Sequence, residues 1–60
     1  MKINSKSVRS ITGTARVERH DKATFNGRQS TDVTILRFDD MELWLTDAQR
    51  RKLIDALAVV

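Results

Sequence analysis

Hydrophobic and polar residues alternate along most of this chain, as they do in strands that bury one face. Asn26-Gly27 interrupts the alternation, and this dipeptide is the strongest short signal for a tight hairpin turn. Asp39-Asp40 interrupts it again, and aspartate tolerates turn conformations through local bonds between side chain and backbone. The pattern therefore predicts a three-stranded antiparallel β-meander, with strands over about 9–25, 28–38 and 41–46.

A helix is predicted after the third strand. Thr46 is placed to cap it, and Gln49, three residues later, completes a capping box. Asp47 in the first turn complements the helix dipole. Apolar residues then recur at helical spacing along a helix over about 47–58, namely Leu53, Ile54, Leu57 and Val60. The predicted fold class is α+β, with one face of the sheet packed against this single C-terminal helix.

The two turns also predict which residues share a face of the sheet. A two-residue turn at Asn26-Gly27 pairs Val17 with Leu36, and one at Asp39-Asp40 pairs Leu36 with Leu43. A slip of one residue at either turn would scatter the apolar residues over both faces. We therefore expect the helix to cover one apolar set: Ala15, Val17, Leu36, Phe38, Met41, Leu43 and Leu45.

Length and composition predict a small cytoplasmic domain. The chain has 60 residues and no cysteine, so disulfides and thiolate metal sites are excluded. The polar segment 1–7 lacks the apolar core of a signal peptide and is expected to be a flexible tail before a single domain over 8–60. No stretch is long and apolar enough to span a membrane. Because so short a chain builds a small core, we expect it to need a partner subunit.

The face of the sheet opposite the helix is the predicted binding surface. Trp44 and Ile35 are cross-strand partners there, and tryptophan is enriched at binding hot spots. One helix cannot cover both faces, so this surface is left for a protein partner or a second copy. The alternative is that arginine side chains and the N-terminal segment half-cover Trp44. The predicted partner or dimer surface comprises Val33, Ile35, Trp44, Arg37 and Arg16.

Positive charge is concentrated in the first third of the chain. The formal net charge is +3, and residues 1–22 carry six lysines and arginines against two acids. The first hairpin is longer than the helix, so its distal part, the 19–31 arm, is expected to project as a basic ribbon or relax into a loop. Such ribbons can contact nucleic-acid phosphates, although a solvated hairpin tip is the simpler interpretation. The candidate nucleic-acid contacts are Arg9, Arg19, Lys22 and Arg28.

No residue pattern indicates catalysis or a cofactor. His20, the only histidine, has no nucleophile or acid partner at a characteristic spacing. Asp39, Asp40 and Glu42 provide too few oxygens for a calcium site, and turn formation explains the two aspartates. Gly13 and Gly27 are isolated, so no phosphate-binding loop is present, and Gly13 is expected to mark a bulge or a close approach in the first strand. We predict no catalytic residue, metal site, cofactor or small-molecule substrate.

These features predict a small non-enzymatic protein-binding module, acting as a homodimer. Free-standing basic proteins of this size are typically regulators or inhibitors that occlude a partner's surface, as phage-borne proteins that block host machinery do. The alternative is a nucleic-acid-binding accessory protein that uses the 19–31 arm. A third possibility is a subunit of a larger assembly.

Overall fold

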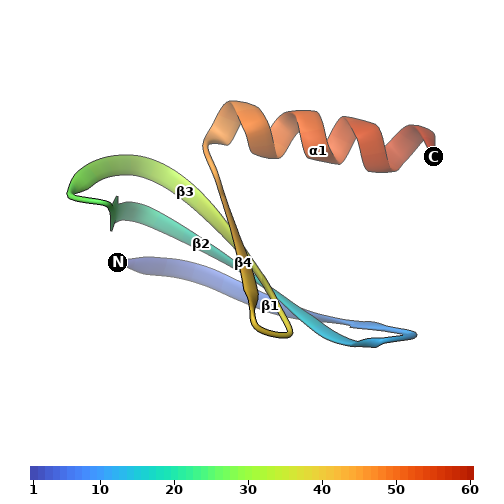
Figure 1. The fold of residues 1–60 in the computed structure, drawn as a ribbon. Helices are drawn as coiled ribbons and strands as arrows, with labels where there is room; N and C mark the ends of the chain where they lie inside the picture. The colour runs from blue at the N-terminus through green and yellow to red at the C-terminus, as the bar shows by residue number, and fades with distance from the viewer.

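The computed structural model describes all of residues 1–60, which form a four-stranded antiparallel sheet and one helix (Figure 1). Each strand lies beside the next in chain order. The α+β class, the antiparallel meander and the C-terminal helix are confirmed, whereas the predicted number of three strands is wrong. The elements are β1 (Lys2–Ser10), β2 (Gly13–Phe25), β3 (Arg28–Phe38), β4 (Met41–Leu45) and α1 (Asp47–Val59).

The additional strand arises because the expected first strand is divided by a turn at Ile11-Thr12. The Ser10 hydroxyl donates to the Gly13 carbonyl at 3.0 Å and accepts from the Thr12 amide at 3.2 Å. Gly13 leaves the turn at a φ of +150°, which a residue with a side chain rarely adopts. Residues 2–10, including most of the expected tail, therefore pair with β2.

Both predicted hairpin registers are confirmed. Val17 pairs with Leu36 across the first hairpin, and Leu36 pairs with Leu43 across the second. Asn26 and Gly27 take φ values of +53° and +76°, as a turn with two left-handed residues requires. Asp39 also takes a positive φ, of +54°. The sheet therefore has the two faces that the sequence predicts.

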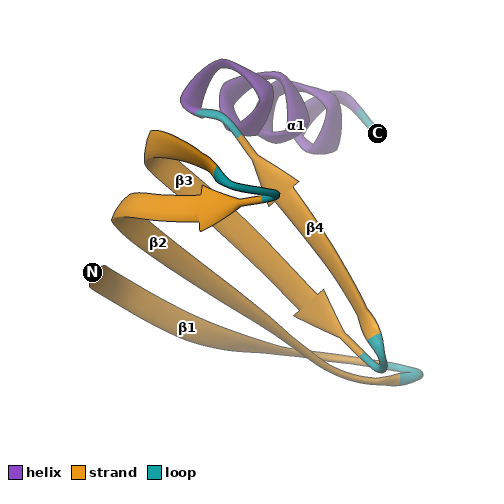
Figure 2. Cartoon of the chain, turned by 60° about the vertical axis from the view of Figure 1, so that its left-hand side comes forward, coloured by secondary structure: helices purple, strands orange, loops and turns teal.

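Helix α1 begins with the predicted capping box. The Gln49 amide donates to Thr46 Oγ1 at 3.3 Å, and the Thr46 amide donates to Gln49 Oε1 at 3.0 Å. The helix starts beside the end of β4 and approaches only β3 and β4 (Figure 2). No residue of α1 is buried, so the helix covers the predicted apolar face only in part.

The β2–β3 hairpin folds back over the other face of the sheet instead of projecting as an arm. Figure 2 shows the β2–β3 hairpin curving back near its tip, and within β3 Asp32 has a φ of +55°. Beyond the bend, the Phe25 ring packs against Trp44. This contact covers the face opposite α1, where Ile35 is 1% exposed and Val33 is 4% exposed. The small core thus lies on the face that was predicted to be open, because the hairpin tip supplies the cover that the single helix cannot.

Candidate functional site

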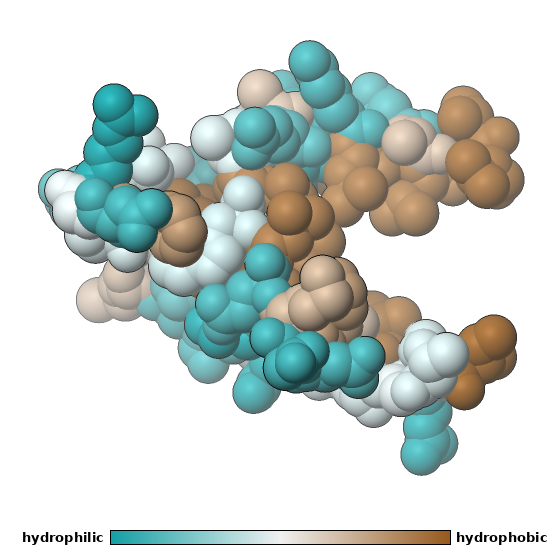
Figure 3. Space-filling view, in the orientation of Figure 1, coloured by the Kyte–Doolittle hydropathy of each residue, from teal (hydrophilic) through white to brown (hydrophobic).

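An apolar groove separates α1 from the sheet. It has a volume of about 240 Å³. Figure 3 shows hydrophobic residues along the inner side of the helix and at the base of the opening between helix and sheet. We name this feature the helix groove, and its apolar walls are Val17, Leu36 and Leu45 from the sheet and Leu53, Ile54 and Leu57 from α1.

The helix groove stays open because α1 contacts the sheet at only one end. Leu45 and Leu53 lie close to the connection between β4 and the helix, and both are half-buried. Farther along the helix, Leu57 is 68% exposed. On the same face of the sheet, Met41 is 59% exposed and Leu43 is 45% exposed. The apolar set that the sequence assigned to the core therefore forms a surface that water reaches.

Charged groups border the closed end of the groove. Arg50 Nη2 donates to Asp47 Oδ1 at 2.9 Å, and this bond is the main reason that the pKa of Asp47 lies below its ordinary value. Arg19 forms an ion pair with Asp32, which raises the pKa of the Arg19 guanidinium. The groove consequently has an apolar interior and a largely neutralised charged rim.

Two polar atoms that line the groove have no hydrogen-bond partner, Arg19 Nε and the hydroxyl oxygen of Thr34. Thr34 is 3% exposed, and its Oγ1 makes no hydrogen bond within the chain. It lines the groove beside Leu36 and Leu45. A buried hydroxyl without a partner costs free energy, so a group that enters the groove and pairs with Thr34 would be bound more tightly.

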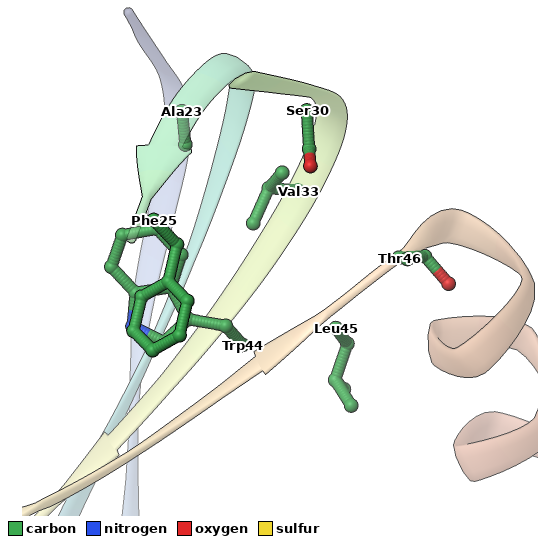
Figure 4. Close-up of a pocket in the computed structure, with 7 residues that line it drawn as sticks. All are labelled: Ala23, Phe25, Ser30, Val33, Trp44, Leu45 and Thr46. Atoms are coloured by element: carbon green, nitrogen blue, oxygen red, sulfur yellow. The ribbon is translucent and has the colours of Figure 1, made fainter. Parts of the chain in front are cut away.

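The predicted partner surface is largely enclosed by the chain itself. Figure 4 shows the Phe25 ring against the Trp44 ring, with the Val33 side chain nearby. Because Val33 and Ile35 are buried, a partner cannot reach either side chain in this fold. Trp44 is half-buried, and its indole Nε1 donates to Glu42 Oε1 at 3.2 Å. The hairpin tip therefore covers the predicted partner surface, in addition to the arginine side chains that the sequence analysis considered.

The two arginines of the predicted partner surface belong to a charged network on the same face. Glu18 lies at its centre and is 8% exposed. Its Oε1 is 3.1 Å from His20 Nε2 and 3.5 Å from Arg37 Nε, while its Oε2 is 3.9 Å from Arg16 Nε. Arg37 also pairs with Glu42. The hydrogen bond from His20, followed by the charges of Arg37, Lys2 and Arg16, lowers the pKa of Glu18.

The four candidate nucleic-acid contacts do not form one surface. Arg9 lies on β1, whereas Lys22 and Arg28 lie on the bent hairpin, and all three are exposed. Arg19 lines the helix groove and is paired with Asp32. Phe25, the only aromatic residue of the 19–31 arm, packs on Trp44 and so is not free to stack on a base. The fold therefore separates these cations instead of aligning them along a ribbon.

No three histidine, aspartate or glutamate side chains are grouped so that they could bind one metal ion. Helix α1 is too short and too polar to cross a membrane. No protein-family model, curated protein or solved structure matches this chain.

Sequence reasoning identified the groove residues but assigned them to the core. The missing information was how far α1 reaches across the sheet. One signal was present: the helix has apolar residues around its whole C-terminal end, Ala56-Leu57-Ala58-Val59-Val60. A helix segment that is apolar all round needs cover on more than one side, and a single sheet face cannot provide it.

Proposed function

We propose that the chain is a small non-enzymatic protein-binding module that acts through the helix groove. The observation that carries the proposal is the open apolar groove between α1 and the sheet, where Ile54 is 50% exposed and Leu57 is 68% exposed. Met41 and Leu43 extend the exposed apolar surface along the same face of the sheet. Contiguous apolar surface of this kind is typical of protein interaction sites. A regulator or inhibitor would use the groove to bind a target and occlude part of its surface.

The groove suits a protein segment better than a small polar molecule. Its walls are aliphatic, and the polar groups at its closed end are Thr34 and the paired side chains of Arg19 and Arg50. An inserted apolar side chain would displace water from both walls, which is the main favourable term in most protein associations. A backbone group beside it could pair with the Thr34 hydroxyl.

Affinity capture with matched variants tests this proposal. The immobilised chain would be exposed to an extract of the cells that make it, beside a double variant, Ile54→Gln with Leu57→Gln, in which both changes are at exposed positions that line the groove. Ile3→Thr is the control, since Ile3 lies on β1 and is 62% exposed without lining the groove. We expect the wild type and the control to retain the same proteins and the double variant to lose them. Equal capture by all three would refute the groove as the binding site.

Nucleic-acid binding is the alternative function, and the exposed cations of Arg9, Lys22 and Arg28 support it. Their separation makes the support weaker than that for the groove. Binding through them would weaken steeply as salt rises, because each neutralised phosphate releases counterions. A gel-shift series on duplex and single-stranded DNA tests this alternative, and it fails if no complex forms at low salt.

A further inference from the structure

The single chain exposes more surface than a compact protein of its mass. Its accessible surface is 5102 Å², whereas a folded monomer of 6.9 kDa is expected to expose about 4,000 Å². Its radius of gyration is 12.1 Å, against about 10 Å for a compact chain of 60 residues. The excess of about 1,100 Å² is comparable to the roughly 800 Å² that each partner buries in a standard stable interface.

The buried core of the single chain is too small to account for the stability of the fold, and of α1 in particular. Only Glu18, Val33, Thr34 and Ile35 are buried, and all four lie on β2 and β3. Helix α1 contributes no buried residue, yet an isolated helix of 13 residues is marginal in water. The apolar side of α1 therefore needs cover that is present whenever the chain is folded. A second copy of the chain meets this requirement, because it is always made together with the first.

The shape of the groove also suits a second copy. Figure 3 shows the gap between helix and sheet opening at the C-terminal end of α1. That end is apolar around its whole circumference, and Val59 and Val60 are among its most exposed residues. A segment of this kind fits a slot with two apolar walls. The chain thus carries both the slot and an insert for it, which is the self-complementarity that a two-fold dimer requires.

From the excess surface and this complementarity we infer that two copies form a two-fold symmetric dimer, in which the C-terminal half of α1 from each copy enters the helix groove of the other. The residues that become covered are Met41, Leu43, Ile54, Leu57, Val59 and Val60. The inference rests on the proposed function, since it names the first occupant of the same groove. A target protein then competes with the second copy, so that target binding splits the dimer.

Sedimentation equilibrium of the intact chain tests the assembly. We expect a mass of twice 6.9 kDa at micromolar to millimolar concentrations. A 6.9 kDa species that keeps full helical circular dichroism at millimolar concentration would overturn the inference. That outcome would leave the proposed function standing, because the groove would then be open to a target.

Isotope-filtered NMR locates the interface in the wild-type protein. A mixture of labelled and unlabelled copies should show contacts between the methyl groups of Leu57 or Val60 in one copy and those of Met41 or Leu43 in the other. A dimer whose intermolecular contacts lie along the free edge of β1, or at Phe25 and Trp44, would overturn the inference even though the mass is doubled.

Two matched variants, both at exposed positions, measure the energetic role of the groove. Leu57 and Ile3 are exposed to similar extents in the single chain, at 68% and 62%. Leu57→Gln keeps a good helix former. It should raise the dissociation constant of the dimer by at least about tenfold, because one apolar side chain is lost from each of two equivalent sites. Ile3→Thr keeps a β-branched residue and should leave the constant unchanged. Equal dimer dissociation constants for the two variants would contradict the inferred interface.

The same variants separate this inference from the proposed function. If Leu57→Gln abolishes target capture but leaves the dimer intact, the groove binds a target and the second copy lies elsewhere. If it splits the dimer but leaves capture intact, the groove is the dimer interface and the proposed binding site is wrong.

Discussion

The ring of Phe25 lies 5.2 Å from the ring of Trp44, with an angle of 43° between their planes. The contact joins the tip of the β2–β3 hairpin to β4, two parts of the sheet that do not pair with each other. It encloses Val33 and Ile35, the two apolar residues that are fully buried. The pair therefore decides which face of the sheet becomes the core and which stays open.

We predict that the two rings stabilise each other directly. In a double-mutant cycle, Phe25→Leu and Trp44→Leu should each lower the free energy of unfolding, and their coupling should be about 0.5–1.5 kcal/mol. Urea denaturation of the four proteins measures this coupling. Additive effects would mean that the hairpin tip is held by other contacts. Phe38→Leu, on the opposite face, is the control and should not couple with Trp44→Leu.

Gly13→Ala tests the turn between β1 and β2. An added Cβ would meet no atom within 4 Å, so any effect comes from the backbone, whose φ of +150° suits glycine alone. We expect a loss of about 1–3 kcal/mol in the free energy of unfolding. Hydrogen exchange should show the amides of β1 losing protection before those of β3 and β4. Unchanged protection of β1 would contradict the turn geometry.

The registers of the two predicted hairpins could be derived from the sequence because local chemistry fixes them. Asn26-Gly27 supplies two left-handed residues, and alternating side chains allow only one register that gathers the apolar residues. The capping box at Thr46 and Gln49 is equally local. These features depend on neighbouring residues alone, so the pattern was sufficient.

The remaining features depend on distant contacts or on rarer turn chemistry. Ile11 and Thr12 are β-branched and resemble strand residues, so the turn that creates β1 was hidden, although Ser10 and Gly13 flank it. The positive φ of Asp32 and the curvature of the hairpin have no signal in the sequence, and this curvature brings Phe25 to Trp44. The open groove has a separate cause, since α1 approaches only β3 and β4 and leaves the rest of its face of the sheet uncovered.

Replacement by glycine should have different effects on stability at the two aspartates of the β3–β4 turn. Asp39 has a φ of +54°, which costs a residue with a side chain more than it costs glycine, whereas Asp40 does not have a positive φ. We expect Asp39→Gly to be more stable than Asp40→Gly by about 1 kcal/mol. Thermal unfolding of the two variants gives the comparison directly. The reverse order would mean that the β3–β4 turn has a different backbone conformation.

Acid should destabilise the protein in part through Glu18. Because its pKa is lowered in the folded chain, Glu18 contributes stability above the pKa of an unfolded glutamate, about 4.3, and loses it as the pH falls through the folded value. The free energy of unfolding should therefore decrease below about pH 4.3, and Glu18→Gln should make this decrease shallower. Urea titrations at a series of pH values test this, with Asp55→Asn on α1 as the control. If the free energy of unfolding of Glu18→Gln falls with decreasing pH as steeply as that of the wild type, the charged network does not stabilise the ionised Glu18.

The start of α1 should depend strongly on its cap, because no buried residue anchors the helix. Thr46→Ala removes the oxygen that accepts from the Gln49 amide, and we expect a loss of about 1 kcal/mol. Thr46→Ser keeps that oxygen and should be nearly neutral. Far-ultraviolet circular dichroism during urea denaturation measures both variants. If α1 is held by a second copy, the loss in Thr46→Ala should appear at low protein concentration and shrink as the concentration rises. A loss that is independent of concentration would show that the helix is stabilised within one chain.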